Sequence, residues 1–300
     1  MRVAVLLTGN LRSWRLCGQV LKNCLLSRYD CDVFMSVDLD NTLQCVGENP
    51  SSFSKTTELE EAINFYKPIK VYSGCGYTEN LFESISSDIV HIVPEAPCPE
   101  VSLKGSAYHI MELAKNANFL KAKLAKESLK ILFEQYFYCK KAYELLEAHM
   151  KEQTVSYDLV LRIRFDQLLW SDADSSPVKF FQTNSKGVIY SEKNIEIAKS
   201  VSITFQLDEP EVDEICVFGC GVHHNYVYVN DQFWAHGPDM IAYIKNFYSS
   251  LPVIIDSCST SYPFFGASIE HFFFLYLRGK KIMRSKLSGI FVRLNNGADI

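Results

Sequence analysis

Residues 3–10 read VAVLLTGN, an unbroken apolar run followed by a turn sequence. A continuous apolar run of this length is typical of a strand buried on both faces, and TGN (8–10) ends it. Apolar residues at helical spacing follow over 11–26, and 32–37 (DVFMSV) is rich in residues that favour strands. The order strand, helix, strand predicts a parallel pair.

The pattern continues along the chain with an acidic helix at 58–65 and a third strand at 69–72. A long helical region is predicted over 118–150, with an apolar stripe that we expect in the core: Leu132, Tyr136, Cys139, Tyr143, Leu146 and Met150. Further strands are predicted at 157–169, 188–190 and 215–218, and further helices at 240–248 and 268–277. We therefore expect one α/β domain: a mostly parallel, open, Rossmann-type sheet flanked by helices, with a smaller antiparallel extension in the second half.

Composition narrows the class of protein. The 300 residues are 48% hydrophobic and carry a formal net charge of −5, which favours a folded core and argues against a nucleic-acid partner. The ten cysteines include no CxxC pair, and Cys17 and Cys24 lie on one predicted helix face, so we expect reduced thiols. The first apolar run is too short for a signal peptide, and no stretch is long enough for a membrane span. A cytoplasmic protein is expected.

The end of the first strand is the first candidate site, because ligands of open α/β sheets bind beyond the carboxyl ends of the strands. There, Thr8, Gly9, Asn10 and Arg12 combine a flexible backbone position with a guanidinium that can form paired hydrogen bonds with phosphate. These residues are predicted to bind a nucleotide or diphosphate. An ordinary turn with a solvated arginine is an equally good interpretation of this motif alone.

The second strand ends in Asp38-Leu39-Asp40, a DxD spacing in which two carboxylates can share a divalent cation. Such triplets are also frequent in loops. An acidic residue at the tip of the second strand can instead hold a ribose hydroxyl, and this is the role that we predict for Asp38.

Charged residues alternate with apolar ones in YDLVLRIRFD, residues 157–166. Arg162, Arg164 and Asp166 fall on one face of the predicted strand, where buried charges need partners. We predict that they receive a charged ligand, although a purely structural ion-pair network is the alternative.

The segment NDQFWAHG, residues 230–237, compresses polar and aromatic side chains into one connection. Aromatic faces stack on sugars, and a carboxylate beside them can accept a proton from a hydroxyl. Asp231 is thus a candidate catalytic base, and Asn230 and Gln232 are candidate donor-binding residues. Asp231 could alternatively cap the helix that begins near Pro238, but it lies far upstream for a cap.

Several of these stretches, in this order, resemble a family of glycosyltransferases from polysaccharide loci and from large DNA viruses of algae and protists. They are VAVLLTGNLRSW, CDVFMSVD, YKP, KAYELLEAHM running into YDLVLRIRFD, and NDQFWAHGPDM. The likeness spans most of the chain, and RIRFD and NDQF are its more specific parts.

The resemblance implies a GT-A type fold, a nucleoside-diphosphate sugar donor, and a glycan or glycoprotein acceptor. Residues 1–166 would form the nucleotide-binding half and 167–300 the acceptor and sugar half of one domain. It also implies a divalent cation, Mn²⁺ or Mg²⁺, at Asp166; a viral member would work in the host cytoplasm. This chain departs from the family's DxD, because Arg164-Phe165-Asp166 supplies one carboxylate, and the arginines could neutralise the diphosphate themselves.

Two other functions use the same features. A nucleotidyltransferase would bind at the same strand ends but would release pyrophosphate from a nucleoside triphosphate. A non-catalytic carbohydrate- or nucleotide-binding module would bind donors without turning them over.

Overall fold

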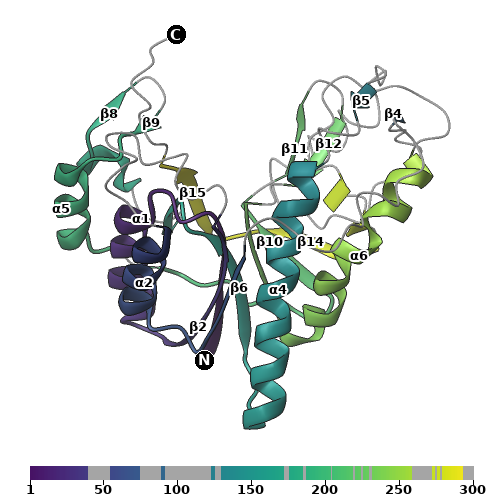
Figure 1. Ribbon diagram of the computed structural model, residues 1–300, viewed down its shortest axis with the longest axis horizontal. Coiled ribbons are helices and arrows are strands. Elements are labelled where there is room, and N and C mark those ends of the chain that lie inside the picture. The colour runs from purple at the N-terminus through teal and green to yellow at the C-terminus, as the bar shows by residue number, and fades with distance from the viewer. Residues whose placement is uncertain are drawn as a thin grey trace. The chain divides into compact units, whose positions relative to one another are not determined.

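A computed structural model describes residues 1–39, 55–74, 89–91, 123–125, 130–171, 176–184, 187–203, 205–218, 220–223, 226–229, 232–258, 272–273, 276–277 and 279–292 (Figure 1). The chain divides into two compact units that interleave in sequence. The first unit comprises Met1–Gly76, Lys141–Glu209 and Lys286–Ile300, and the second comprises Tyr77–Lys140 and Pro210–Ser285.

The sheet of the first unit confirms the expected parallel α/β arrangement. Its strands are β1 (Arg2–Gly9), β2 (Asp30–Asp38), β3 (Lys70–Gly74) and β6 (Leu159–Arg164), in the spatial order β6-β1-β2-β3. All three pairings are parallel. The strand β1 is buried from Val3 to Leu7, as its apolar run predicts for a central strand.

Helices cover both faces of this sheet. Figure 1 shows α1 (Trp14–Leu21) and α2 (Lys55–Tyr66) on one side; a π-helical turn (Lys22–Leu26) follows α1. The second half of α4 (Lys130–Gln153) covers the opposite face, where His149 lies against the Phe34 ring and Glu152 pairs with Lys70. In the predicted stripe of α4, Tyr136, Cys139, Tyr143 and Leu146 are buried, Met150 is half-buried, and the side chain of Leu132 lies outside the described set.

The face under α4 turns polar towards the carboxyl ends of the strands. Thr8 pairs in register with Ser36 on one side and with Arg164 on the other, so these three side chains lie next to one another. The opposite face remains apolar to the end, with Leu7, Val37 and Ile163 buried. The alternation of apolar and charged residues in β6 therefore places its arginines on the polar face.

The predicted strand over 157–169 is wrong as a single element. β6 ends at Arg164, Phe165 and Asp166 form a turn, and a separate strand β7 (Gln167–Ser171) pairs antiparallel with β15 (Leu287–Phe291). Asp166 thus lies in a turn and not on the strand face of the arginines. The first unit also contains a 3-10 turn (Pro177–Phe180), β8 (Thr183–Asn184), β9 (Gly187–Val188) and α5 (Glu192–Ser200).

The second unit supplies the predicted antiparallel pairing. Its strand β10 (Glu214–Val217) is parallel to β14 (Lys281–Arg284) and antiparallel to β13 (Phe233–His236). Its other described elements are the hairpin β11 (Cys220–His223) and β12 (Tyr226–Val229), the pair β4 (Ile89–His91) and β5 (Lys123–Ala125), a 3-10 turn (Pro238–Met240) and α6 (Ile241–Cys258). Residues 123–125 are a strand, so the helix predicted over 118–150 is wrong there; α4 begins at Lys130.

Aromatic rings fill the core of the second unit. Trp234 is fully buried, stacks on Tyr136 and tilts against Phe273, while Phe233 stacks on Phe218 at 4.6 Å between ring centroids. The interpretation of these rings as a sugar platform is therefore wrong for Phe233 and Trp234. Both lie in β13, where their large apolar areas are removed from water.

Candidate functional site

The candidate site lies in the first unit, at the carboxyl ends of β1 and β6. Along the chain, β2 and then β3 are added to one side of β1, whereas β6 pairs with the other side of β1. The strand order therefore reverses between β1 and β6, and open α/β sheets bind their ligands at such a reversal, beyond the carboxyl ends.

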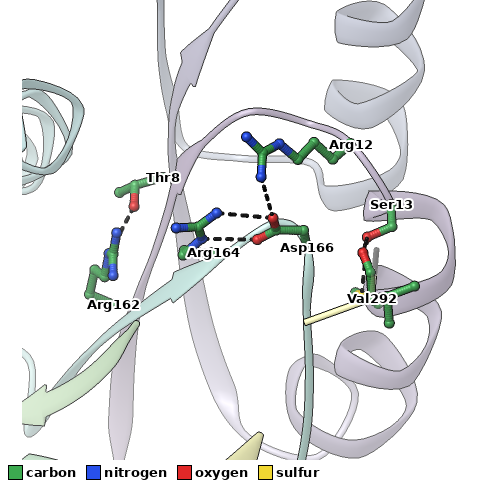
Figure 2. Close-up of polar contacts among 8 residues, drawn as sticks. Thr8, Arg12, Ser13, Arg162, Arg164, Asp166 and Val292 are labelled. Carbon is green, nitrogen blue, oxygen red and sulfur yellow. Dashed lines mark hydrogen bonds and ion pairs between the residues drawn. The ribbon is translucent and has the colours of Figure 1, made fainter. Parts of the chain in front are cut away.

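Two arginines converge on one carboxylate at this position (Figure 2). Arg164 donates from Nε to Asp166 Oδ1 at 2.9 Å and from Nη2 to Oδ2 at 3.0 Å, while Arg12 donates from Nη1 to Oδ2 at 3.2 Å. We call these three residues the arginine cluster. The side chain of Asp166 is only 5% exposed, whereas those of Arg164 and Arg12 are 22% and 35% exposed. The carboxylate is enclosed, whereas both arginine side chains are partly exposed.

The cluster holds Asp166 in its charged form. Burial alone would raise the pKa of Asp166, but the charges and hydrogen bonds of Arg164, together with the charge of Arg12, outweigh burial and lower it. Two guanidinium charges surround this single carboxylate, so the cluster carries a net positive charge.

Backbone conformation places Arg12 at the cluster. Gly9, the last residue of β1, has φ +98°, and Arg12 itself has φ +36°, a left-handed value that is uncommon for residues with a side chain. No described atom lies within 4 Å of the position that a Cβ on Gly9 would take, so there is room beside the backbone there. Strained backbone conformations of this kind cluster at functional sites.

Asn10 connects the cluster to the end of β2. Its amide, oriented so that each atom faces a complementary group, donates to Asp38 Oδ2 at 2.8 Å and accepts from Arg12 Nη2 at 3.3 Å. Asp38 is buried. Its predicted contact with a ribose stays a prediction, and its partner Asp40 in the DxD spacing lies outside the described residues.

Arg162 supports Thr8 from within the sheet. It is 1% exposed and donates from Nε to Thr8 Oγ1 at 2.9 Å (Figure 2). Because its guanidinium is enclosed, Arg162 adds positive charge beneath the site and orients Thr8 without reaching solvent. Direct donor contact is predicted for Arg162 from the strand pattern and for Thr8 from the end of the first strand, and the burial of both side chains does not support it.

The carboxyl-terminal segment completes the site, and no feature of the sequence predicts this. Val292 donates its backbone N–H to the Asp166 carbonyl at 3.0 Å, and its own carbonyl accepts from Ser13 Oγ at 2.9 Å. The Phe291 ring lies 4.5 Å from the Arg164 guanidinium carbon. These contacts fix the Asp166 turn and the plane of Arg164 from a strand far away in the chain.

The site retains unused hydrogen-bonding capacity. Among the described residues, Arg12 Nε, Ser36 Oγ and both amide atoms of Gln167 are buried without a partner. Unpaired buried donors are costly and call for an explanation. The Arg12 Nε–H is closed to solvent, so an oxyanion ligand could accept a hydrogen bond from it only after a shift of this side chain.

The arginine cluster does not fit a resident divalent cation. Both oxygens of Asp166 accept hydrogen bonds from guanidinium groups, and a cation at this carboxylate would lie beside two positive charges. Within the described residues, no group of three or more His, Cys, Asp or Glu side chains could hold a metal ion. A metal at Asp166 therefore remains a prediction.

The remaining predicted residues are not brought into this site by the described structure. Asn230 and Asp231 lie outside the described residues, and Gln232 is half-buried in the second unit, just before β13. The proposed roles of these three residues stay predictions.

Five cysteines of the described part are free thiols: Cys17, Cys24, Cys31, Cys139 and Cys216. Cys17 and Cys24 are both buried in the core, and burial raises the pKa of Cys17, so that thiol is unreactive. No helix in the described part of the chain is long and apolar enough to cross a membrane.

No protein-family model matches the sequence, and no curated protein matches it either.

Proposed function

We propose that the protein is a GT-A-like glycosyltransferase that moves a sugar from a nucleoside diphosphate to a hydroxyl of a glycan or glycoprotein. The arginine cluster is proposed to bind the diphosphate of the donor. The observation that carries the proposal is the convergence of Arg12 and Arg164 at the strand-order reversal between β1 and β6.

The charge of the cluster suits a diphosphate. Guanidinium groups form paired hydrogen bonds with phosphate oxygens, and these are stronger than neutral hydrogen bonds. Arg12 and Arg164 are both partly exposed, so a ligand can reach them while Asp166 keeps them in place. Gly9 lets the β1 backbone turn beside such a ligand.

The same groups can assist the reaction. When the acceptor oxygen bonds to the anomeric carbon of the sugar, the bond from that carbon to the diphosphate oxygen breaks, and negative charge develops on the leaving diphosphate. Fixed guanidinium donors aimed at this oxygen stabilise that charge without reorganising during the reaction. Arg12 and Arg164 are the proposed groups.

The acceptor hydroxyl loses its proton in this reaction, and Asp231 is the proposed base if the enzyme inverts the anomeric centre. Asn230 and Gln232 are proposed to contact the donor sugar, and Asp38 the ribose. The free thiols suit a reducing compartment such as the cytoplasm.

A thermal-shift panel of UDP-, GDP- and dTDP-sugars, with and without Mn²⁺, tests the proposal. A ligand that binds only the folded state at 100 times its Kd adds about 2.7 kcal/mol to the free energy of unfolding. We expect at least one donor to raise Tm in the wild-type chain and to fail in Arg164→Ala. No response to any nucleotide sugar would contradict the proposal.

Product analysis separates the proposed reaction from its alternatives. A glycosyltransferase releases a nucleoside diphosphate and a glycoside, a nucleotidyltransferase releases pyrophosphate from a nucleoside triphosphate, and a binding module releases neither. Asp231→Asn is expected to abolish transfer while the donor-induced Tm shift persists. Retained turnover would remove Asp231 from the role of base.

A further inference from the structure

We propose that Asp166 is a positioning residue that holds Arg12 and Arg164 for the ligand, and that the diphosphate is neutralised by guanidinium groups and not by a divalent cation at Asp166. This inference rests on the proposed function, since it concerns the same site. It differs from what the family resemblance implies, which is a metal at that carboxylate.

The first observation that supports this proposal is the set of hydrogen bonds that Asp166 accepts. Oδ1 accepts from Arg164 Nε, and Oδ2 accepts from both Arg164 Nη2 and Arg12 Nη1, at 2.9 to 3.2 Å. Guanidinium donors occupy three of the roughly four lone-pair positions of the carboxylate, so a divalent cation would have to share its oxygens with them. It would then lie within a few ångströms of two positive charges, where Coulomb repulsion opposes its binding.

The second observation is that the residues around Asp166 hold it in place. Its turn is tied to Val292 through the backbone, and Phe291 packs on the guanidinium of Arg164. The carboxylate is therefore fixed, and it fixes both guanidinium groups in turn. A fixed counter-ion beneath two partly exposed arginines is an arrangement that presents donors to a ligand.

The third observation is that the Nε–H donor of Arg12 has no partner among the described residues. Nη1 is occupied by Asp166 and Nη2 by Asn10, whereas Nε is buried and has no partner among the described residues. A shift of the Arg12 side chain on binding would open Nε to an oxygen of the diphosphate, which would supply the acceptor that Nε lacks. A cation would not, because a guanidinium only donates hydrogen bonds.

Calorimetric titration of the full chain with inorganic pyrophosphate tests this inference without knowledge of the nucleobase. We expect pyrophosphate to bind in EDTA, and Arg12→Lys and Arg164→Lys to weaken it by about tenfold or more, since lysine loses the paired donors. Asp166→Asn is expected to change the affinity by the same factor in EDTA and in Mn²⁺. That equality follows because Asp166 acts through the arginines and not through a metal.

A double-variant cycle separates positioning from a general structural effect. If Asp166 acts through Arg12, the effects of Asp166→Asn and Arg12→Lys on pyrophosphate affinity are not additive. Additive effects would contradict the positioning role.

Matched controls come from the opposite end of the same sheet. There Arg2 donates to Asp32 Oδ2 from Nη2 at 2.7 Å and from Nε at 3.2 Å, and the Arg2 side chain is 36% exposed, like that of Arg12. Arg2→Lys and Asp32→Asn alter a comparable ion pair at the amino ends of β1 and β2. They are expected to leave pyrophosphate affinity unchanged, so a loss in these controls equal to that in Arg12→Lys would overturn the assignment.

The outcomes separate this inference from the function on which it rests. Binding of pyrophosphate only with Mn²⁺, lost in Asp166→Asn, would overturn the inference and leave the sugar-transfer proposal standing. Absence of binding by pyrophosphate and by every nucleotide sugar, with and without Mn²⁺, would overturn both.

Discussion

The positive φ of Arg12 lowers the free energy of unfolding, and two substitutions at this position can measure by how much. Arg12→Gly and Arg12→Ala both delete the guanidinium and its hydrogen bonds to Asp166 and Asn10. The side-chain loss therefore cancels when the two variants are compared. What remains is the difference between glycine and alanine at φ +36°.

The expected difference follows from two opposing terms. A left-handed conformation costs a residue with a Cβ roughly 1–2 kcal/mol, and glycine avoids this cost. Glycine in turn loses about 0.5–1 kcal/mol more conformational entropy than alanine on folding. We therefore expect the free energy of unfolding of Arg12→Gly to exceed that of Arg12→Ala by about 1 kcal/mol.

Differential scanning fluorimetry or urea denaturation checks this difference, which corresponds to about 2 °C in Tm for a chain of this size. Arg2 provides the control, because it lies in β1 and is not among the residues with positive φ. There glycine should be the less stable replacement. The reasoning is refuted if Arg12→Ala is as stable as Arg12→Gly or more stable.

Three further predictions concern stability. Burial lowers the pKa of His236 to about 4, so this residue takes up a proton in the unfolded chain at a higher pH than in the folded chain. As the pH falls from about 6.5 to 4, the free energy of unfolding should therefore drop by up to roughly 3 kcal/mol. Urea denaturation of His236→Asn over the same pH range should lack this contribution to the pH dependence. A Cβ on Gly18 would overlap the Tyr66 hydroxyl, so Gly18→Ala should cost about 1–2 kcal/mol by thermal denaturation, and adding Tyr66→Phe should recover most of it. Glu58→Ala removes the buried carboxylate that pairs with Arg15 at 2.7 Å and accepts from Trp14 Nε1 at 3.0 Å. Arg15 keeps its pair with Glu61, so a loss of about 2 kcal/mol is expected in urea denaturation, mainly from the unpaired Trp14 donor; an unchanged midpoint would contradict this.

The parallel core of the first unit could be predicted from the sequence because its signal is local. The apolar run at 3–7 and the strand-like stretch at 32–37 each carry their own pattern, and both are strands in the structure. The glycine after the first run indicates a turn, and Gly9 has a positive φ in the structure. Local patterns of this kind need no knowledge of distant contacts.

The turn at Asp166 could not be predicted, because alternation of apolar and charged residues continues through it. What ends β6 at Arg164 is pairing of the next residues with β15, which is more than a hundred residues away in the chain. The contacts of Phe291 and Val292 with the cluster have the same origin. A pattern read along one segment contains no information on which distant strand will pair with it.

Phe233 and Trp234 are predicted at a sugar site but lie in the hydrophobic core. Tryptophan and phenylalanine beside polar residues suit a sugar site and a hydrophobic core equally well by type. Only packing distinguishes them, and here both rings are fully buried.

Docking of a diphosphate on the arginine cluster can be observed atom by atom by NMR. In protein labelled with ¹⁵N-arginine, the Nε–H resonances of Arg12, Arg164 and Arg2 are assigned from their lysine variants and followed while pyrophosphate is added. We predict saturable shifts of the Arg12 and Arg164 resonances, with Arg2 unmoved. Unchanged Arg12 and Arg164 resonances at saturating pyrophosphate would contradict the proposed binding site.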